Sequence, residues 1–305
     1  MAIMNVLVIG YGSIGKRHVS ILQNLKCNVF VVSSQLNTGV DCYPTLESAF
    51  VAQKYDYIVI ANKTNEHKHT LDKLQKLGFS CTVLVEKPLY ATYYEAIYDF
   101  EIYVGYNLRF HPITQYLKNN IERENIISIQ GYVGQYLPTW RPSTDYSLSY
   151  SASKDSGGGV LRDLSHELDL YHYLFGEWHS LQAVVEKCTN LKITSDDHVL
   201  LQYKNKEGSL VQLTLNYLDH IHQRKIIINT NMSTYIADYI NNTIVHNEQV
   251  VNFKSERNDT YHLQHEALLK KDHMIVCNYN EGLYTNKMID KIEQASREKV
   301  TIINE

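Results

Sequence analysis

The chain has few of the residues that mark specialised structural classes. Its five cysteines, at positions 27, 42, 81, 188 and 277, lie far apart and form no C-x-x-C pair. Their odd number and spacing support neither a disulfide framework nor a zinc site, so we expect no metal. No apolar run approaches the length of a membrane span, and the N-terminus enters a strand pattern without the basic start of a signal peptide. We therefore expect a cytoplasmic protein with no membrane partner.

An excess of charge of one sign is also missing. Lys and Arg number 29 against 33 Asp and Glu, which gives a net charge of −4. This balance gives no electrostatic case for binding nucleic acid or an anionic membrane. With 44% hydrophobic and 20% charged residues, the 305-residue chain has an ordinary globular composition and suits one large or two ordinary domains.

The first motif follows the first predicted strand. The apolar run at 6–9 leads into Gly10, Gly12 and Gly15, a G-x-G-x-x-G pattern that is followed by a helical pattern. In this strand–turn–helix context Gly10 allows a tight turn and Gly12 lets the backbone approach a pyrophosphate. Gly15 lets helix and strand pack closely. The sequence therefore predicts a dinucleotide site at the start of the chain.

The residues around this motif extend the prediction. Ser13 and Ile14 open the helix, where backbone amides can bind phosphate. His18 falls on the apolar face of the helix, so we interpret it as a packing residue. The second strand, 28–32, ends in Ser33 and Ser34, where an acidic residue would hold the ribose of NAD and an arginine would favour NADP. The two serines leave the choice between NAD and NADP open.

Alternation of strands and helices continues to about residue 106. The pattern predicts a helix over 46–53, a buried strand over 57–61, a helix ending near Leu77, a strand over 82–85, a short helix after Pro88 and a strand over 102–106. Such alternation predicts a doubly wound parallel sheet. His67 is either a first-turn residue of the helix that ends near Leu77 or a residue that faces the nicotinamide.

Glu86-Lys87-Pro88 stands at the end of the strand over 82–85. Proline cannot continue the strand, and ligands of open α/β sheets bind beyond the carboxyl ends of their strands. The motif is therefore either a solvated charge pair or a lysine donor that meets a bound small molecule, with Glu86 beside it.

The pattern changes near Arg109. A helix is predicted over 113–122, and strands are predicted at about 126–136, 181–187, 197–203, 209–218, 223–230, 233–239 and 242–246. Long, alternating strands of this kind predict a mostly antiparallel sheet with one covered face. We expect a domain boundary near Arg109.

A second chemical stretch begins with three glycines at 157–159, which can let another molecule approach the backbone closely. In the helix expected next, Leu161, Leu164, Leu168, Tyr171 and Phe175 form one core stripe. Asp163 and His166, about 60° apart on that helix, face away from the stripe, so they form either a solvated polar pair or a pair that points at a ligand. Glu167 and Asp169 are second choices.

Together these features resemble the glucose-fructose oxidoreductase/inositol dehydrogenase/MocA (Gfo/Idh/MocA) family. The resemblance rests on the N-terminal glycines, on Glu86-Lys87-Pro88 and on the glycines before the helix with Asp163 and His166, and residues 105–110 look like the family's domain junction. In the common pattern the histidine follows the aspartate by four residues, whereas here it follows by three. The residues 165–167, with Trp140-Arg141-Pro142 and Asp145-Tyr146 upstream, look like those of surface-sugar biosynthesis enzymes.

The resemblance implies an α/β fold with an N-terminal Rossmann doubly wound parallel sheet (1–108) and a C-terminal α/β domain (109–305) with a large open, mostly antiparallel sheet. In the family, the exposed face of that sheet often forms the subunit interface, so we expect a homodimer or homotetramer. Lys87, Asp163 and His166 are the implied catalytic residues, and Arg109, Arg141, Tyr146 and Tyr150 are expected substrate contacts. The expected contacts to NAD or NADP are Gly10, Gly12, Ser13, Ile14, Ser33, Ser34, Ala61, Asn62, His67, Glu86 and Lys87.

The sequence thus leads to the hypothesis of hydride transfer between a nicotinamide cofactor and a secondary alcohol or ketone of a sugar, polyol or sugar derivative. His166 is the best candidate base, Asp163 fixes its tautomer, and Lys87 stabilises charge on the reacting oxygen. Lys87 is either held charged by Glu86 or lowered in pKa by burial. Two alternatives stay open, namely a non-catalytic dinucleotide sensor and elimination or glycoside chemistry with recycled cofactor.

Overall fold

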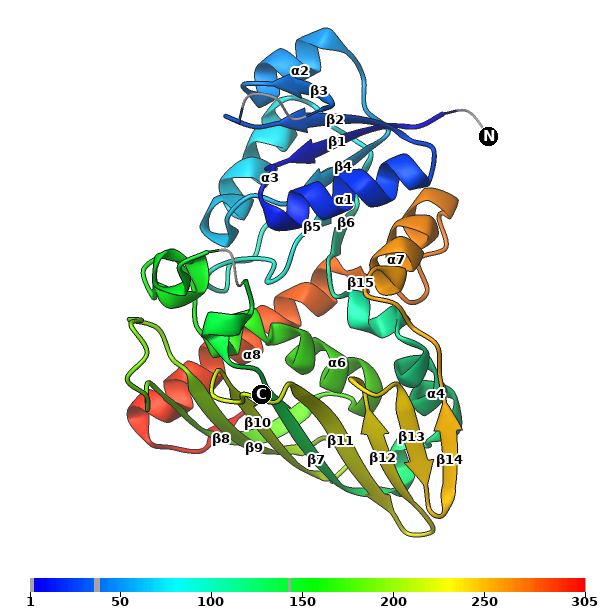
Figure 1. The fold of residues 1–305 in the computed structure, drawn as a ribbon, viewed down its shortest axis with the longest axis vertical. Coiled ribbons are helices and arrows are strands. Elements are labelled where there is room, and N and C mark those ends of the chain that lie inside the picture. The colour runs from blue at the N-terminus through cyan, green and yellow to red at the C-terminus, as the bar shows by residue number, and fades with distance from the viewer. Residues whose placement is uncertain (1–2, 36–38, 142–143, 305) are drawn as a thin grey trace. The chain divides into compact units, whose positions relative to one another are not determined.

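The apolar run after residue 4 forms β1 (Asn5–Ile9), which pairs with β2 on one side and β4 on the other (Figure 1). This computed structural model describes residues 3–35, 39–141 and 144–304. The sheet has the order β15-β6-β5-β4-β1-β2-β3, in which β1 to β6 are parallel and β15 is antiparallel. The other strands are β2 (Asn28–Val32), β3 (Asp41–Tyr43), β4 (Tyr57–Ile60), β5 (Thr82–Val85), β6 (Ile102–Val104) and β15 (Cys277–Asn278).

Both faces of this sheet are covered by helices. Val6 and Val8 of β1 pack in a cluster with α1 (Ser13–Asn24) and α7 (Asp259–Lys270). Leu7 and Ile9 point to the other face, toward α2 (Leu46–Ala52) and α3 (His67–Lys76). A strand with both faces buried reads as a continuous apolar run, as β1 does. The predicted doubly wound sheet is confirmed, and its β3-β2-β1-β4-β5-β6 order is typical of dinucleotide-binding folds.

The chain divides into two compact units. The first comprises residues 1–110 and Glu256–Asn286, and the second comprises His111–Ser255 and 287–305. This division differs from a single cut near Arg109, because the chain returns to the first unit to supply α7 and β15. The helix α8 (Tyr279–Glu298) has residues in both units.

The prediction of a short helix after Pro88 is wrong. Residues 89–101 contain no helix, and some of their polar groups instead bond to side chains from elsewhere in the first unit. The Tyr90 amide donates to Asn286 Oδ1 at 3.2 Å, and Asn286 Nδ2 donates back to the Tyr90 carbonyl at 2.6 Å. Farther along, the Tyr98 hydroxyl donates to Asp72 Oδ1 at 3.0 Å.

The second unit is built on a nine-stranded sheet with the order β14-β13-β12-β11-β7-β10-β9-β8-β16. Its strands are β7 (Ile126–Gly134), β8 (Trp178–Glu186), β9 (His198–Asn205), β10 (Leu210–Asn216), β11 (Gln223–Thr230), β12 (Thr234–Asp238), β13 (Thr243–His246), β14 (Gln249–Asn252) and β16 (Ile302–Ile303). β7 and β10 run parallel, and the other neighbours are antiparallel. The predicted mostly antiparallel sheet is confirmed, although β14 and β16 were not expected.

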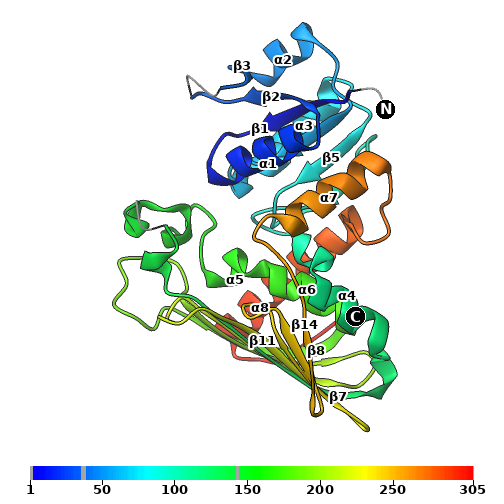
Figure 2. The same cartoon turned by 45° about the vertical axis from the view of Figure 1, so that its right-hand side comes forward.

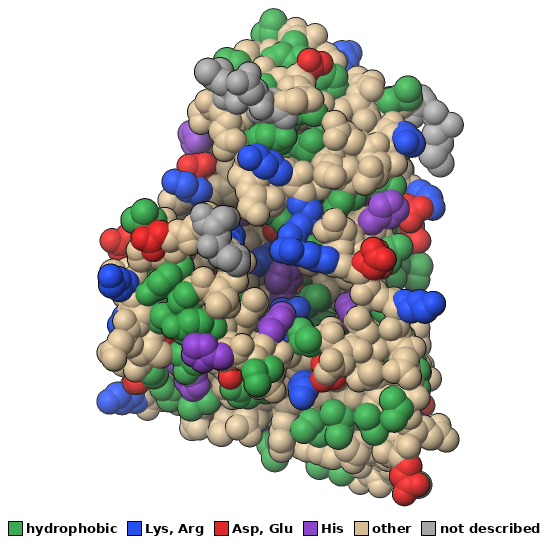
Figure 3. All heavy atoms as spheres, viewed as in Figure 1, with side chains coloured by type: hydrophobic (Ala, Val, Ile, Leu, Met, Phe, Trp, Pro, Cys, Tyr) green, Lys and Arg blue, Asp and Glu red, His purple; other side chains and the backbone are tan. Residues whose placement is uncertain are grey.

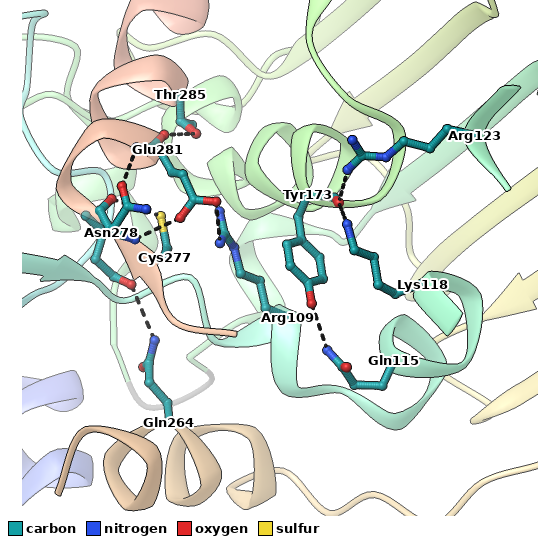
Figure 4. A network of polar contacts seen from close by, with 11 residues as sticks. Arg109, Gln115, Lys118, Arg123, Tyr173, Gln264, Cys277, Asn278, Glu281 and Thr285 are labelled. Carbon is teal, nitrogen blue, oxygen red and sulfur yellow. Dashed lines mark hydrogen bonds and ion pairs between the residues drawn. The ribbon is translucent and has the colours of Figure 1, made fainter. Parts of the chain in front are cut away.

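One face of this sheet is covered. Figure 2 shows α4 (Pro112–Asn120), α5 (Val160–Asp163), α6 (Ser165–Phe175) and part of α8 on the same side of the strands. Two basic side chains bind the C-terminal turn of α6. Lys118 Nζ and Arg123 Nη2 each donate a hydrogen bond to the Tyr173 carbonyl at 2.7 Å (Figure 4). Positive charge at a helix C-terminus is stabilising.

In the described part of the chain, no helix is both long enough and apolar enough to cross a membrane.

Candidate active site

The turn after β1 is shaped by two glycines. Gly10 has φ +98°, and a Cβ there would lie 2.7 Å from backbone atoms of Ala61 and Asn62 at the end of β4. A Cβ on Gly15 would lie 2.0 Å from the Gly10 carbonyl oxygen, which is far inside contact distance. These two positions therefore require glycine so that α1 can start close against the sheet.

Gly12 differs from its neighbours because a Cβ at this position would meet no protein atom within 4 Å. It is the N-cap of α1, it has no side chain to cap the helix, and the first turn of α1 contains no acidic residue. Ser13 and Ile14 are the first helical residues. An open approach to uncapped amides at a helix N-terminus fits the pyrophosphate of a dinucleotide.

The second strand ends without a carboxylate. Ser33 Oγ accepts a hydrogen bond from the Gln35 amide at 3.0 Å, and Ser34 is exposed. The Ser33 amide donates to the Tyr43 carbonyl of β3, so the backbone here is held by the sheet. This end of β2 therefore holds two serines, one of them exposed, where a ribose of the cofactor would lie.

His67 is a structural residue, which decides between the two roles considered for it. It is 1% exposed, with Nδ1 3.1 Å from the Leu89 carbonyl oxygen and Nε2 3.3 Å from the Asn62 carbonyl oxygen. Burial lowers the pKa of His67, so the ring is neutral near pH 7. The His67 ring therefore connects the segment after β4 to the segment after Pro88. Of the two other predicted cofactor contacts here, Ala61 is buried and Asn62 Nδ2 donates to Thr70 at 2.9 Å.

Glu86 and Lys87 directly follow β5, at the carboxyl edge of the parallel sheet. Glu86 is 6% exposed, so a solvated charge pair does not describe the motif. Its Oε1 lies 2.9 Å from His18 Nε2, and its Oε2 accepts a hydrogen bond from the Lys87 amide at 3.2 Å. Lys87 is half-buried and the Lys87–Pro88 peptide bond is cis.

The charge of Glu86 is maintained by its partners. Burial alone would raise the pKa of this carboxyl group, but the hydrogen bond and charge of His18, with the charge of Lys87, hold the pKa below its ordinary value. His18 is fully buried, as its position on the apolar face of the helix predicts. Both Glu86 oxygens have protein partners, so we assign Glu86 to holding the turn rather than to the predicted contact with cofactor.

Arg109 does not fit a substrate contact. Its side chain is 1% exposed, and Nη1 lies 3.0 Å from Glu281 Oε1 within the first unit (Figure 4). Glu281 Oε2 also accepts from the Asn278 amide at 2.9 Å, beside the start of α8. The structure therefore corrects the prediction for Arg109, because a buried arginine with a carboxylate partner supports the chain itself.

The helix expected around Asp163 and His166 is interrupted. α5 ends at Asp163 and α6 begins at Ser165, so the two residues do not share one continuous helix. The predicted core stripe nevertheless is buried, since its five members Leu161, Leu164, Leu168, Tyr171 and Phe175 are at most 7% exposed. Asp163 and His166 are half-buried, as residues facing away from that stripe should be.

Asp163 has a partner that was not predicted. The Tyr217 hydroxyl donates to Asp163 Oδ2 at 2.6 Å, and burial followed by the charge of Asp163 raises the pKa of Tyr217 well above its ordinary value. Tyr217 therefore stays a donor. Alternation after β10 could have revealed it, because Leu213, Leu215 and Tyr217 continue one buried face.

Glu167, a second choice in the sequence, lies in the core. It is completely buried and its Oε1 is 3.0 Å from Arg224 Nε. Asp169 is 1% exposed. Their burial favours a structural role for both residues, in contrast to the half-buried Asp163 and His166.

The glycines before α5 make room for the chain itself. A Cβ on Gly158 would lie 2.2 Å from the Tyr150 carbonyl oxygen, and one on Gly159 would lie 2.1 Å from Asp196 Oδ1. Asp196 Oδ2 in turn accepts from the Leu161 amide at 2.9 Å and so supports the first turn of α5. The expectation that these glycines admit another molecule is corrected at Gly158 and Gly159.

The remaining predicted substrate contacts lie in the segment before α5. Arg141 is exposed, and Pro142 lies outside the described residues. The Tyr146 hydroxyl accepts from the Lys192 amide at 3.2 Å, and the Tyr150 hydroxyl donates to the Gly157 carbonyl at 2.5 Å. These tyrosine hydroxyls hold the loop together, whereas the Arg141 side chain extends into solvent.

The surface carries both signs of charge. On the face drawn in Figure 3, basic and acidic side chains are scattered singly and in small groups among uncharged ones. Among the described residues no group of three or more His, Cys, Asp or Glu side chains is arranged to hold a metal ion.

Comparison with known proteins agrees with this architecture. Residues 4–102 match the model of an oxidoreductase family with an NAD-binding Rossmann fold, and residues 115–234 match the model of the GFO/IDH/MocA C-terminal domain. The chain belongs to the Gfo/Idh/MocA family. The resemblance stated from the sequence is thus confirmed, and the dinucleotide turn belongs to an NAD-binding domain.

One curated relative of this chain is levoglucosan dehydrogenase of Pseudarthrobacter phenanthrenivorans, which is 30% identical to it over 140 residues. The match covers 43% of this chain and 36% of that protein's length.

Solved structures match over nearly the whole chain. Levoglucosan dehydrogenase without ligands superimposes with a TM-score of 0.86 at 16% identity and full coverage of both chains. The WlbA dehydrogenase of Bordetella pertussis, solved with NADH and UDP-GlcNAcA, gives 0.81 at 17% identity, with 99% of each chain covered. GenD2 from gentamicin A biosynthesis, solved with NAD, gives 0.82 at 16% identity, with 100% of this chain and 97% of that chain covered. At such low identity these matches show the fold.

We predict that acid destabilises the first unit. Burial, with His18 and His262 nearby, lowers the pKa of His265 on α7 well below 6.5. Below about pH 6.5 the unfolded ring binds a proton that the folded ring does not, so stability falls as pH decreases. The lowered pKa of Glu86 adds a further loss below pH 4.5.

Hydrogen exchange at pH 7.5 and pH 5.0, corrected for intrinsic rates, measures this effect in β4, β5 and α7. His265→Gln should reduce the pH dependence, and replacement of the exposed His69 should leave it unchanged. Equal protection of these three elements at both pH values would contradict the prediction.

Proposed function

We propose that the protein is an NAD(P)-dependent oxidoreductase that transfers a hydride between nicotinamide and a secondary alcohol or ketone of a sugar, polyol or sugar derivative. The observation that carries this proposal is the position of Lys87. It is the second residue after β5, in the same parallel sheet whose β1–α1 turn leaves open space at Gly12.

The sheet topology supports a common ligand for these two features. β1 and β5 flank β4, and neighbouring strands lie about 4.8 Å apart, so the two carboxyl ends are separated by about 10 Å. Ligands of open α/β sheets lie along this edge. A dinucleotide with its pyrophosphate at Gly12 can therefore extend toward Lys87.

When bound, NAD(P) accepts or supplies the hydride, and the residues of this chain orient the substrate and manage the proton. Lys87 donates a hydrogen bond to the reacting oxygen and stabilises the charge that develops there. His166 takes up the hydroxyl proton of the substrate in the oxidative direction and returns it in the reductive one. Asp163, fixed by the Tyr217 hydroxyl, orients His166 and stabilises its protonated form.

The substrate class is supported by the relatives. Levoglucosan dehydrogenase has been solved with levoglucosan, and the WlbA dehydrogenase has been solved with UDP-GlcNAcA. Arg141 is exposed, and none of the ion pairs found between described residues includes it. We assign Arg141 to a carboxylate or phosphate of the substrate, since its guanidinium can bind either group with two hydrogen bonds. This charge favours a nucleotide sugar or sugar acid of surface-sugar biosynthesis.

We predict that Gly12→Val abolishes binding of NAD and NADP without unfolding the protein. The valine meets no protein atom at its Cβ but occupies the approach of the pyrophosphate. Titration of each cofactor, followed by protein fluorescence, gives its dissociation constant. Gly15→Val is the contrasting variant, because its Cβ would clash with the Gly10 carbonyl and should lower the melting temperature. Tight cofactor binding by the Gly12 variant would contradict the placement of the pyrophosphate.

We predict that Lys87→Met lowers turnover by about 10²- to 10⁴-fold while the cofactor dissociation constants stay within about twofold. The matched control is Lys54→Met, which removes an exposed lysine at the opposite ends of the strands. Formation of reduced nicotinamide is followed with NAD⁺ and NADP⁺ separately, over polyols, hexoses, nucleotide sugars and sugar acids.

Three outcomes of this assay distinguish the proposed oxidoreductase from its alternatives. Activity that is lost in the Lys87 variant and kept in the Lys54 variant supports the oxidoreductase and names its substrate and cofactor. Equal activity in wild type and the Lys87 variant contradicts the role of Lys87. Cofactor binding without reduction of any substrate favours a sensor or a recycled cofactor instead.

We also propose that the uncovered face of the nine-stranded sheet joins subunits into a homodimer or homotetramer. It exposes apolar side chains on adjacent strands, and Val184 of β8 pairs directly with Leu200 of β9, with both more than 40% exposed. Contiguous apolar surface of this kind marks interaction sites.

Sedimentation equilibrium should therefore give an oligomer for wild type and a smaller species for Leu200→Arg. Ile97→Arg, at an exposed residue of the first unit, should leave the assembly unchanged. A wild-type monomer at micromolar concentration would rule out this interface.

A further inference from the structure

A chain of four buried polar side chains runs through the first unit and ends at the turn that carries Lys87. Glu86 Oε1 lies 2.9 Å from His18 Nε2, and His18 Nδ1 lies 2.8 Å from His265 Nε2. His265 Nδ1 lies 3.0 Å from the Tyr57 hydroxyl. All four residues are at most 6% exposed, and they come from the segment after β5, from α1, from α7 and from β4.

Hydrogen-bonding chemistry allows two proton arrangements in this chain. A carboxylate only accepts, so His18 Nε2 carries a hydrogen toward Glu86. If His18 is doubly protonated, its Nδ1 donates to His265, and His265 donates to the Tyr57 oxygen. If His18 is neutral, His265 donates to His18 and Tyr57 donates to His265. Both arrangements use every ring nitrogen, and they differ by one proton.

Burial determines which members carry charge. The pKa of His265 is lowered by desolvation, by His18 and by His262, and the pKa of Tyr57 is raised by desolvation, with Cys27 and Glu86 adding to it. Both groups are therefore neutral near pH 7. Glu86 is the anionic member, and a buried carboxylate needs a cation or donors close to it.

Two further ring side chains lie near Glu86 or its partner His18. The charge of Glu86 acts on the pKa of His67 on α3, but burial keeps that ring neutral near pH 7. The rings of Tyr261 on α7 and His18 pack in a T-shaped arrangement. Gly105 leaves room for the carboxylate, since a Cβ there would lie 3.0 Å from Glu86 Oε1. Among the described residues, His18 and Lys87 are the two whose hydrogen bonds and charge lower the pKa of Glu86.

We propose that His18 and His265 are positioning residues for Lys87, which hold the Glu86 carboxylate in place so that the Lys87 ammonium keeps a fixed negative neighbour. The Lys87 amide donates to Glu86 Oε2, so the same carboxylate also fixes the backbone from which the lysine projects. α1 therefore serves two purposes, because its first residues face the cofactor phosphates and its buried face holds the lysine turn.

Loss of His18 would leave the buried carboxylate without its main partner, and Glu86 would then bind a proton. A neutral Glu86 would no longer favour the charged form of Lys87. The effect on turnover rests on the proposed function, but the effect on the ionisation of Lys87 does not.

The test measures that ionisation directly. Reaction of amines with acetic anhydride is followed by mass spectrometry from pH 6 to 11, with labelling of Lys87 normalised to that of the exposed Lys54. The variants are Glu86→Gln, which keeps the shape of the side chain, and His18→Phe, with His18→Gln added in case the larger change prevents folding. Tyr55→Phe is the control, since it removes a side-chain hydrogen bond of a buried residue of the first unit that lies outside the chain of four.

In folded Glu86→Gln and in folded His18→Phe or His18→Gln, the pH of half-maximal labelling of Lys87 should fall by about one unit or more. Tyr55→Phe should leave it unchanged. A labelling midpoint that stays at the wild-type value in the Glu86 and His18 variants would overturn the proposal, even if Lys87→Met abolishes turnover. Conversely, a shifted midpoint with full activity of Lys87→Met would support this positioning role and reject the catalytic role proposed for Lys87.

Discussion

The buried contact between Glu86 and His18 is the constraint on which much of the first unit depends. A carboxylate without water is unfavourable unless donors surround it, and here a histidine and a backbone amide supply them. Because His18 stands on α1 and Glu86 follows β5, the contact fixes the glycine turn and the lysine turn with respect to each other. His67 adds a second connection between neighbouring strand ends. Buried hydrogen bonds therefore connect the strand ends along the edge of the sheet where a cofactor would lie.

The second unit differs from the first in that helices cover only one face of its sheet. Its sheet has one face under helices and one face uncovered, so side chains alternate between buried and exposed along β9. Asp163 and His166 lie half-buried on helices that cover one face of this sheet. Tyr217, which follows β10, donates a hydrogen bond to Asp163. The break at Leu164 separates two helices, so that Asp163 ends the first and His166 lies in the first turn of the second.

Local signals in the sequence predicted much of this. Glycine spacing identified the β1–α1 turn, Pro88 marked the end of β5, and alternation located most strands of the second sheet, because each depends on residues close together in the chain. Contacts between distant residues could not be read in this way. His265 lies 247 residues after its partner His18, and Glu281 lies 172 residues after Arg109, so nothing near His18 or Arg109 reveals these partners. The edge strand β16, with two residues, is too short to show a pattern.

The return of residues 256–286 to the first unit has a consequence for how the protein is made. On the ribosome, the first 110 residues emerge long before α7 and β15, yet one face of their sheet and one of its edges need those later elements. Contacts of such long sequence separation slow folding, and exposed strand edges invite mispairing. The N-terminal sheet therefore stays incompletely covered until residues 256–286 have been synthesised.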